Sequence, residues 1–319
     1  MSHQFHFRSY KPTDAPAIDQ LLHAIWNDDS GARRYYAPDS ALDNPDAFHH
    51  TIVVEPVQGS ATAVIAFGNV SHELTQPTHA FLNLNVHPNF QHQGIGTALF
   101  HQLTTHLASR AAYPILTATY ENQAHAIAFL QKWGFQEQMR TFLPHLDVAE
   151  VKLDILVQKA VALSERGYHI MSMAAASADP ARDQKLADLL YEIYAAMHPI
   201  NPPGPVMYEQ RREIFLSDLL PEATFIAVQQ NDYAAVGTLH ESERPHALDF
   251  GLCGVSQAYQ ANALELGLAI KAHEIAFARR HQVKRLVAEI DSTDTLGMQL
   301  LATLPFHHRP AWITFGRAL

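Results

Sequence analysis

The sequence has little cysteine, no long apolar run and a shortage of positive charge. Its one cysteine, Cys253, excludes an intramolecular disulfide and a cysteine-rich zinc site. No apolar run approaches the roughly 18 residues of a membrane span, and the first residues lack a signal-peptide core, so we expect a cytoplasmic chain with no membrane partner. Lys and Arg number 22 against 32 Asp and Glu, without a basic run, so we do not expect nucleic acid as a partner.

What the chain does contain is typical of a folded protein of more than one domain. It has 319 residues, of which 47% are hydrophobic and 17% are charged, enough for two domains of ordinary size. The 21 histidines are scattered, with pairs at 49–50 and 307–308. No His-x-x-x-His pair stands on a predicted helix, so we predict no metal site and interpret most histidines as solvent-exposed.

One segment, VHPNFQHQGIGTAL from Val86 to Leu99, carries the strongest pattern. It follows a predicted strand at 81–86 and leads into a predicted amphipathic helix at 97–110. A glycine loop at this place leaves backbone N–H groups directed at one spot, where the positive end of the helix dipole also points. Gly94 and Gly96 carry no Cβ, so a ligand can approach the backbone closely. The segment therefore suits a phosphate or pyrophosphate.

Other glycine-loop motifs fit the segment less well. A dinucleotide-binding loop requires a third glycine where this chain has Leu99, and it belongs on the first strand of its domain. A P-loop requires Gly-Lys-Ser/Thr after the loop, which is missing here. Taken alone, Gly-x-Gly is also compatible with a tight turn that binds nothing. The sequence around the loop therefore has to decide between a ligand-binding loop and a simple turn.

The sequence after the loop supplies that context. A β-branched strand at 115–120 is followed by a short helix within 121–135 that ends at Gly134. Together the two blocks resemble motifs A and B of the GNAT acetyltransferase superfamily. In motif A, V-x-P-x-x-Q/R-x-x-G-x-G/A, the matching residues are Val86, Pro88, Gln91, Gly94 and Gly96. In motif B they are Asn122, Ala126, Phe129, Lys132, Gly134 and Phe135.

The resemblance implies a site for acetyl-CoA. In this family pantetheine pairs with the motif A strand and the pyrophosphate meets the amides of the loop, so a backbone N–H, that of Val86, is expected to face the thioester carbonyl. Asn122 matches the asparagine that contacts the cofactor arm. The implied cofactor-binding residues are Leu84, Asn85, Val86, Gln91, His92, Gln93, Gly94, Ile95, Gly96, Thr97, Asn122 and Phe129.

The catalytic groups are less clearly defined. Many family members place a tyrosine acid after the motif B phenylalanine, but this chain has Leu130, which cannot donate a proton. Tyr120 is a candidate substitute and packing is its alternative role. His87 and Glu121 are the candidate general bases, since both are expected near the opening between the two central strands, although a turn histidine is often only solvent-exposed.

The order of elements occurs twice, with an offset of about 169 residues from Val86 to Val255. We therefore predict an α+β fold of two tandem GNAT domains, at 1–150 and 168–319, with a connecting helix at 151–167. Each domain is expected to have a mostly antiparallel sheet with a central parallel strand pair, flanked by helices. The corresponding segments are strands 5–10 and 168–173, helices 12–26 and 181–197, hairpins 51–70 and 223–242 (turning at Gln58-Gly59 and Asn231-Asp232), strands 81–86 and 248–255, helices 97–110 and 266–281, and strands 115–120 and 283–291.

The second copy keeps family features but not the phosphate chemistry. Val255, Tyr259 and the Pro310 to Ile313 block resemble the second domain of tandem members. Gln260, Ala261 and Ala263 stand where the family has arginine and two glycines, and Glu265 replaces a small residue, so methyl groups and a carboxylate would oppose a pyrophosphate. We interpret this half as a scaffold, with a second acetyl-CoA site as the alternative. Asp249, Cys253, Glu289 and Asp291 are residues that a cleft there would contain, without a ranking among them.

The sequence thus predicts an N-acetyltransferase that transfers an acetyl group from acetyl-CoA to an amine of a small molecule or peptide by direct attack. A non-catalytic acyl-CoA-binding or interaction protein is the alternative, and a longer acyl-CoA is a third possibility. The net charge of −10 suits cationic acceptors such as polyamines, aminoglycosides or basic peptides. We expect a monomer or homodimer.

Overall fold

The computed structural model describes residues 4–26, 48–57, 64–110 and 112–318. The chain divides into two compact units. Unit 1 comprises Met1–Ala118, Leu130–Gln136 and Phe315–Leu319, and unit 2 comprises Thr119–Phe129 and Glu137–Thr314. Both units are discontinuous in sequence, whereas the predicted domains were contiguous. The predicted connecting helix is α5 (Leu153–Glu165), and it belongs to unit 2.

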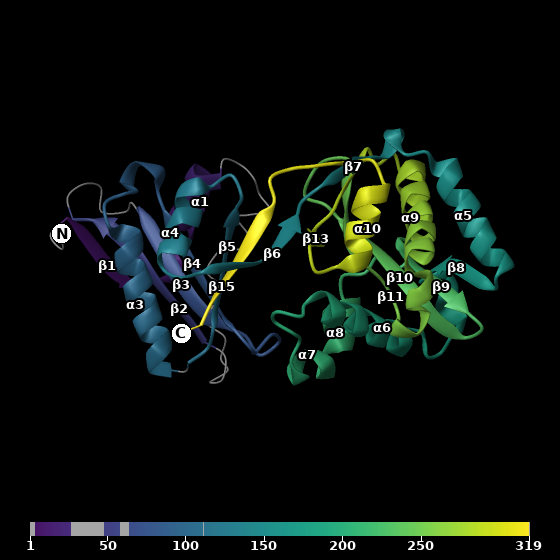
Figure 1. Cartoon of the computed structure of the whole chain (residues 1–319), viewed down its shortest axis with the longest axis horizontal. Helices are drawn as coiled ribbons and strands as arrows, with labels where there is room; N and C mark the ends of the chain where they lie inside the picture. The colour runs from purple at the N-terminus through teal and green to yellow at the C-terminus, as the bar shows by residue number, and fades with distance from the viewer. Residues whose placement is uncertain (1–3, 27–47, 58–63, 111, 319) are drawn as a thin grey trace. The chain divides into compact units, whose positions relative to one another are not determined.

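Unit 1 holds strands β1 to β4 and most of β5 of the first sheet, whose full strand order is β1-β2-β3-β4-β5-β15-β6-β13 (Figure 1). The pairs β1–β2, β2–β3 and β3–β4 are antiparallel, and β4–β5 is parallel. The elements of unit 1 are β1 (Phe5–Ser9), α1 (Ala15–Trp26), β2 (Phe48–Pro56), β3 (Ala66–His72), β4 (Ala80–Val86), α3 (Ile95–Arg110) and all but the end of β5 (Ile115–Tyr120). The residues of α4 (Ala124–Lys132), β6 (Gln136–Phe142) and β15 (Trp312–Arg317) are divided between the two units, and β13 (Ile290–Asp291) belongs to unit 2.

Helix α3 packs its apolar stripe onto this sheet. Leu99, Leu103 and Leu107 recur every fourth residue and are completely buried. Gly68 on β3 makes the close approach possible, because a Cβ there would lie 2.8 Å from Leu103 Cδ1. This packing fixes the beginning of α3, and with it the glycine loop, against the end of β4.

Unit 2 holds the second sheet, in the order β14-β7-β12-β11-β10-β9-β8 (Figure 1). Its one described parallel pair is β11–β12. The elements are β7 (His145–Asp147), α5, β8 (Tyr168–Ser172), α6 (Arg182–Met197), α7 (Pro205–Glu209), α8 (Arg211–Leu216), β9 (Thr224–Gln229), β10 (Asp232–Glu241), β11 (Ala247–Val255), α9 (Ala263–Arg280), β12 (Arg285–Val287), α10 (Thr295–Thr303) and β14 (Phe306–His307).

Two helices cover opposite faces of the second sheet. Gly237 on β10 faces α9, since a Cβ there would meet Ile270 and Glu274, while Gly254 on β11 faces α6 through Ile193. Gly237 pairs with Cys253, the neighbour of Gly254, and successive residues of a strand point to opposite faces. Unit 2 is therefore a sheet between two helical layers.

The predicted fold class is confirmed, because each sheet is mostly antiparallel and contains a central parallel pair. Some details differ. The second hairpin turns at residues 230–231, one residue early, with Gln230 at a φ of 59°, and the predicted strand 283–291 is two short strands, β12 and β13. The predicted turn at Gln58-Gly59 lies outside the described residues. Among the described helices, none is both long and apolar enough to cross a membrane.

Candidate functional site

The site begins at the open edge of β4. Strand β3 pairs with β4 along its whole length, from Ala80 to Val86. On the other edge, pairing with β5 is restricted to Ala80 and Phe81, opposite Ile115 and Leu116. Beyond Phe81 the backbone of β4 therefore has one edge without a described strand partner. That edge can hydrogen-bond an extended, amide-containing ligand, and the predicted residues Leu84, Asn85 and Val86 lie on it.

A short 3-10 turn, η2 (Pro88–Phe90), links β4 to the loop. His87 caps this turn, because its Nδ1 accepts a hydrogen bond from the N–H of Asn89 at 3.2 Å. Gln91 ties the loop to the strand, since its Nε2 donates to the carbonyl oxygen of Val86 at 3.2 Å. Both side chains were predicted to serve a ligand or the reaction, and both hold the loop in place.

The loop itself takes a conformation that few residues adopt. His92 has a φ of 60° and Gly94 a φ of 84°, so the chain enters the left-handed region twice within three residues. The first hydrogen bond of α3 runs from the N–H of Ala98 to the carbonyl of Gly94. The N–H groups of the residues before Ala98, which include Gly96 and Thr97, therefore have no acceptor within the hydrogen-bond pattern of the helix. No acidic residue occupies the first turn, so this helix start suits an anion.

A polar strip lies on the opposite face of the same strands. Asn69 pairs with Asn83 in the sheet register, and Asn85 pairs with Phe67, so these side chains share the face that points away from Leu103. Asn69 is 3% exposed and Asn85 is 2% exposed. Among the described residues, Asn69 Oδ1 and Asn85 Nδ2 have no hydrogen-bond partner. The sequence prediction missed Asn69, although polar residues at every second position of strands 66–72 and 80–86 were the available signal.

The remaining predicted site residues belong to the stretch that groups with unit 2. Tyr120 packs edge-on against Trp312 with ring centres 4.6 Å apart, which is the packing role considered for it. Glu121 has both carboxylate oxygens engaged, because Oε1 accepts from the N–H of Ala311 at 2.9 Å and Oε2 accepts from Arg140 at 3.0 Å. Asn122 is exposed, and Phe129 is half-buried. In unit 1, Leu130 is 6% exposed and packs in the core.

The matching loop of unit 2 has a different conformation. Residues 257–262 form a 3-10 helix, η5, that runs directly into α9, and no residue from Ser256 to Glu265 has a positive φ. The tie to the strand is retained, since Gln260 Nε2 donates to the carbonyl of Val255 at 2.7 Å. Ala261 and Ala263 replace the residues that take the left-handed region in unit 1, so the backbone winds into helix instead.

Side chains of unit 2 itself occupy the polar groups around this second loop. The carboxylate of Glu192 accepts the N–H of Gln257 at 2.5 Å and the hydroxyl of Ser256 at 3.2 Å. Arg166 forms an ion pair with Glu265 and donates to Asn262 Oδ1 at 2.5 Å. The Gln257 N–H before the loop and the Glu265 carboxylate within it are thus already partnered, which agrees with the scaffold interpretation of this half.

The four residues that a second-half cleft would contain have different surroundings in the structure. Burial raises the pKa of the Cys253 thiol to about 12, which keeps it protonated and unreactive at neutral pH. Asp291 accepts a hydrogen bond from Thr141 at 2.6 Å. Asp249 lies opposite His240 in the sheet register, with its Oδ1 buried and unpartnered among the described residues. Glu289 has an interaction partner. They do not form one described cluster.

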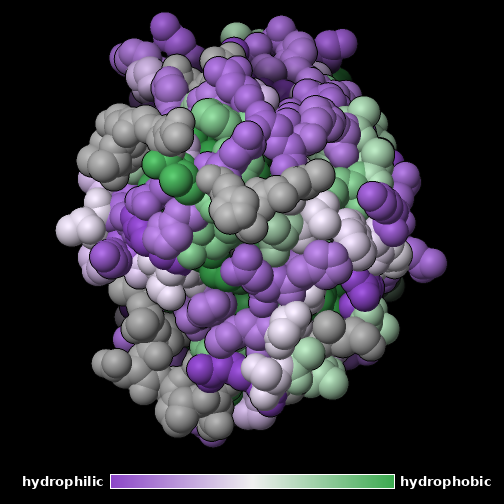
Figure 2. Space-filling view, turned by 90° about the vertical axis from the view of Figure 1, so that its left-hand side faces the viewer, coloured by the Kyte–Doolittle hydropathy of each residue, from purple (hydrophilic) through white to green (hydrophobic). Residues whose placement is uncertain are grey.

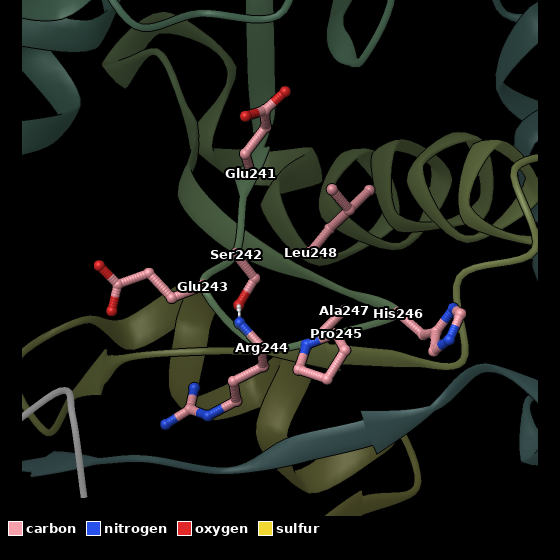
Figure 3. Close-up of a pocket in the computed structure, with 8 residues that line it drawn as sticks. All are labelled: Glu241, Ser242, Glu243, Arg244, Pro245, His246, Ala247 and Leu248. Carbon is pink, nitrogen blue, oxygen red and sulfur yellow. Dashed lines mark hydrogen bonds between the residues drawn. The ribbon is translucent and has the colours of Figure 1, made fainter.

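A pocket with a volume of about 360 Å³ lies elsewhere in unit 2, at the β10–β11 hairpin. Figure 3 shows the residues that line it. Its lining spans Glu241 to Leu248, and the hydroxyl of Ser242 accepts a hydrogen bond from the N–H of Arg244 at 3.3 Å. The pocket contains no residue of the glycine loop.

Figure 2 shows a face of the molecule on which hydrophilic residues dominate and hydrophobic residues are visible between them.

The open edge of the sheet and the glycine loop together indicate the class of protein to which the chain is similar. Each sheet opens beside its parallel pair, and in unit 1 a glycine loop at that opening leads into a helix, an arrangement that suits a phosphate-bearing ligand beside an open strand edge. Residues 16–135 match the model of the acetyltransferase (GNAT) family. The chain therefore carries a domain of this family. No curated protein sequence matches the chain.

Solved structures resemble the whole chain in fold. A GCN5-related N-acetyltransferase from Sphaerobacter thermophilus has a TM-score of 0.68 and 15% identity, with 98% of this chain and 95% of that chain covered. A tandem GNAT protein from the clavulanic acid biosynthesis pathway has a TM-score of 0.66 and 14% identity, with 99% and 98% covered. A glucosamine N-acetyltransferase region in a fungal multi-domain enzyme has a TM-score of 0.70 and 14% identity, covering 99% of this chain and 38% of that one. The tandem GNAT fold thus extends over both units.

Proposed function

We propose that this chain is an acetyl-CoA-dependent N-acetyltransferase that acts on an amine of a small molecule or peptide, with its one cofactor site in unit 1. The observation that carries the proposal is the contrast between the two loops. Gly94, at a φ of 84°, leaves the first loop open at the start of α3, whereas the second loop winds into η5 and contacts Arg166 through Asn262 and Glu265. One acetyl-CoA per chain is therefore expected.

We assign parts of the cofactor to parts of the loop. The pyrophosphate would meet the amides from Gln91 to Thr97, where partial positive charge is concentrated. Pantetheine would extend along the free edge of β4, because that edge offers main-chain donors and acceptors. The thioester carbonyl would then face the backbone of Val86, whose N–H can stabilise the oxyanion that forms as the amine attacks.

The acceptor amine would approach from the polar strip. Asn69 and Asn85 place carboxamide groups on the face of the sheet opposite α3, and the unpartnered Asn69 Oδ1 is a suitable acceptor for an amine N–H. His87 accepts the Asn89 N–H at Nδ1, so in that tautomer the ring carries its hydrogen on Nε2. His87 therefore orients the loop and is not proposed as the base. With no side-chain base assigned, the amine would lose its proton to water.

A panel of amines tests this function, with release of free CoA from acetyl-CoA as the readout. The panel should include polyamines, aminoglycosides and basic peptides, together with neutral amines of similar size. We expect at least one amine to accelerate CoA release. The Gly96→Glu variant should abolish that release, while the reciprocal exchange in unit 2, Glu265→Gly, should leave it unchanged.

A non-catalytic acyl-CoA-binding protein is the second candidate, and two observations favour it. Leu130 is buried where the family has a tyrosine acid, and both oxygens of Glu121 are engaged. If acetyl-CoA binds in unit 1 and no amine in the panel accelerates CoA release, this second candidate replaces the first. Repeating the titration with longer acyl-CoAs distinguishes the preferred acyl chain.

A further inference from the structure

Three metal-ligating side chains meet in unit 2, outside both loops. Asp147 ends β7, Glu150 ends the short 3-10 turn η3 (Val148–Glu150), and His307 ends β14. One ligand atom from each lies within 4.8 Å of the others. We propose that these residues bind one divalent transition-metal ion of the Zn²⁺ type.

The distances between the ligand atoms are close to those of an occupied site, so only a small movement of the side chains would be needed for the ion to bind. His307 Nε2 lies 2.8 Å from Glu150 Oε2 and 3.8 Å from Asp147 Oδ2. A tetrahedral ion with bonds of about 2.0–2.2 Å separates its ligand atoms by roughly 3.3–3.6 Å. One observed separation is below that range and the other is above it. A small rotation of Glu150 away from His307 would make room for the ion.

The backbone that carries the ligands is held on both sides. Strand β7 lies between β12 and β14, with His145 opposite His307 in the register. Arg279, from α9, donates to the carbonyl oxygens of Val148 at 3.2 Å and Val151 at 2.6 Å, which fixes the turn that contains Glu150. A site whose ligands are positioned before binding loses less conformational entropy when the ion arrives.

The orientation of Asp147 is consistent with ligation. It occupies the N-cap position of η3, where an aspartate commonly accepts a backbone N–H, yet its side chain makes no capping bond. Instead, Oδ1 accepts a hydrogen bond from Arg285 Nε at 3.1 Å, and Oδ2 is the oxygen closer to His307. The guanidinium thus orients the carboxylate from the side away from the proposed ion, as an outer partner of a metal ligand does.

The ligand set indicates the class of ion. One imidazole nitrogen and two carboxylate oxygens suit Zn²⁺, and three protein ligands leave a fourth position for water. His145 stacks on His307 with ring centres 5.0 Å apart, and this contact helps to hold the ligand ring in place. The predicted absence of a metal site rested on helical histidine pairs, whereas here Asp147 and Glu150 come from a strand end and the turn after it, and His307 comes from a strand far away in sequence.

Calorimetric titration of ZnCl₂ into the chelator-treated full chain tests the site. We expect one zinc ion to bind, and His307→Ala to weaken that binding at least about ten-fold. His308→Ala is the matched control, because His308 is the adjacent exposed histidine and is outside the cluster; it should bind as the unmodified chain does. A second variant, Glu150→Gln, should also weaken binding. Saturating zinc should raise the thermal midpoint of the unmodified chain by several degrees and that of His307→Ala by less.

Three results would overturn the site. The first is an unmodified chain that binds no zinc. The second is binding that persists unchanged in both His307→Ala and Glu150→Gln. The third is an equal loss in His307→Ala and His308→Ala, which would show binding by exposed histidines in general. Circular dichroism of each variant confirms that a loss of binding is not a loss of fold.

Discussion

Gln91 Nε2 donates a hydrogen bond to the carbonyl oxygen of Val86, five residues earlier, at 3.2 Å. Unit 2 repeats the contact between Gln260 and Val255 at 2.7 Å. The same glutamine tie therefore exists in a loop with an open helix start and in a loop that is filled by its own side chains. It holds the turn after the strand in both units, and the glycines rather than the glutamine distinguish the first loop.

Removing this tie should loosen only the cofactor loop that it holds. We expect Gln91→Ala to weaken acetyl-CoA binding about five-fold, because one hydrogen bond contributes about 1 kcal/mol. Gln260→Ala is the matched control and should leave the affinity unchanged. Calorimetry on both variants gives the comparison, and equal losses in the two would show that the effect is not local to the first loop.

A substitution at Gly94 tests whether the left-handed turn of the loop is required for acetyl-CoA binding. An alanine at a φ of 84° costs about 1–2 kcal/mol of backbone strain, so Gly94→Ala should reduce both the thermal midpoint and the affinity for acetyl-CoA. Gly167→Ala provides the control, because Gly167 has a similar φ of 83° and open space around its Cα. That variant should lose stability and keep the affinity. A Gly94→Ala protein with unchanged affinity would exclude the left-handed turn as a requirement for binding.

Stability should fall on acidification because of two stacked histidines in unit 1. His50 and His106 lie with ring centres 3.8 Å apart, and burial lowers the pKa of each, with the Arg110 charge adding to the effect. The unfolded chain, with histidine pKa values near 6.5, then takes up protons before the folded chain does. The free energy of unfolding should therefore decrease as the pH drops below about 6.5.

Urea unfolding at pH 7.5 and pH 5.5 measures this decrease. Replacing both rings with phenylalanine, His50→Phe with His106→Phe, retains an aromatic pair that does not titrate and should reduce the difference between the two pH values. His125→Gln, at an exposed helix position, should leave the difference as it is. The same pH dependence in the phenylalanine variant would assign it to other groups.

A buried ion pair in unit 2 gives a prediction about stability. Lys271 Nζ lies 2.7 Å from Glu274 Oε2 and 3.8 Å from the centre of the Phe250 ring, and Lys271 and Glu274 are 4% and 0% exposed. Glu274→Ala leaves the ammonium group buried without its carboxylate and should cost about 3–5 kcal/mol. The double variant Lys271→Met with Glu274→Leu removes both charges and should cost less, as measured by urea unfolding. A double variant less stable than the single one would contradict this account.

The sequence predicted the local elements of the site because their signals are local. Strand 81–86 and helix 97–110 correspond to β4 and α3 within two residues at each end, and Gly134 has the left-handed φ expected of a helix stop. These signals are the alternation along a strand, the helical spacing of leucines and a glycine at a turn. Each extends over only a few residues, so it can be recognised in a short stretch of sequence.

The sequence did not predict features that depend on contacts between distant residues. Strand β15, at the end of the chain, lies in the first sheet between β5 and β6, and β7 lies in the second sheet between β12 and β14. A two-copy pattern predicts neither placement, because strand order depends on backbone pairing rather than on residue type. The contact of Arg166 with Glu265 likewise joins positions far apart in sequence, and the sequence showed only that Glu265 was unsuitable beside a phosphate.

Titration of acetyl-CoA into the full chain by calorimetry tests the central claim most directly. One site per chain is predicted, with binding lost in Gly96→Glu and retained in Glu265→Gly, because a carboxylate is placed in the open loop by the first change and removed from the filled loop by the second. Two sites per chain, or binding that survives Gly96→Glu and disappears in Glu265→Gly, would contradict the assignment of the cofactor to unit 1.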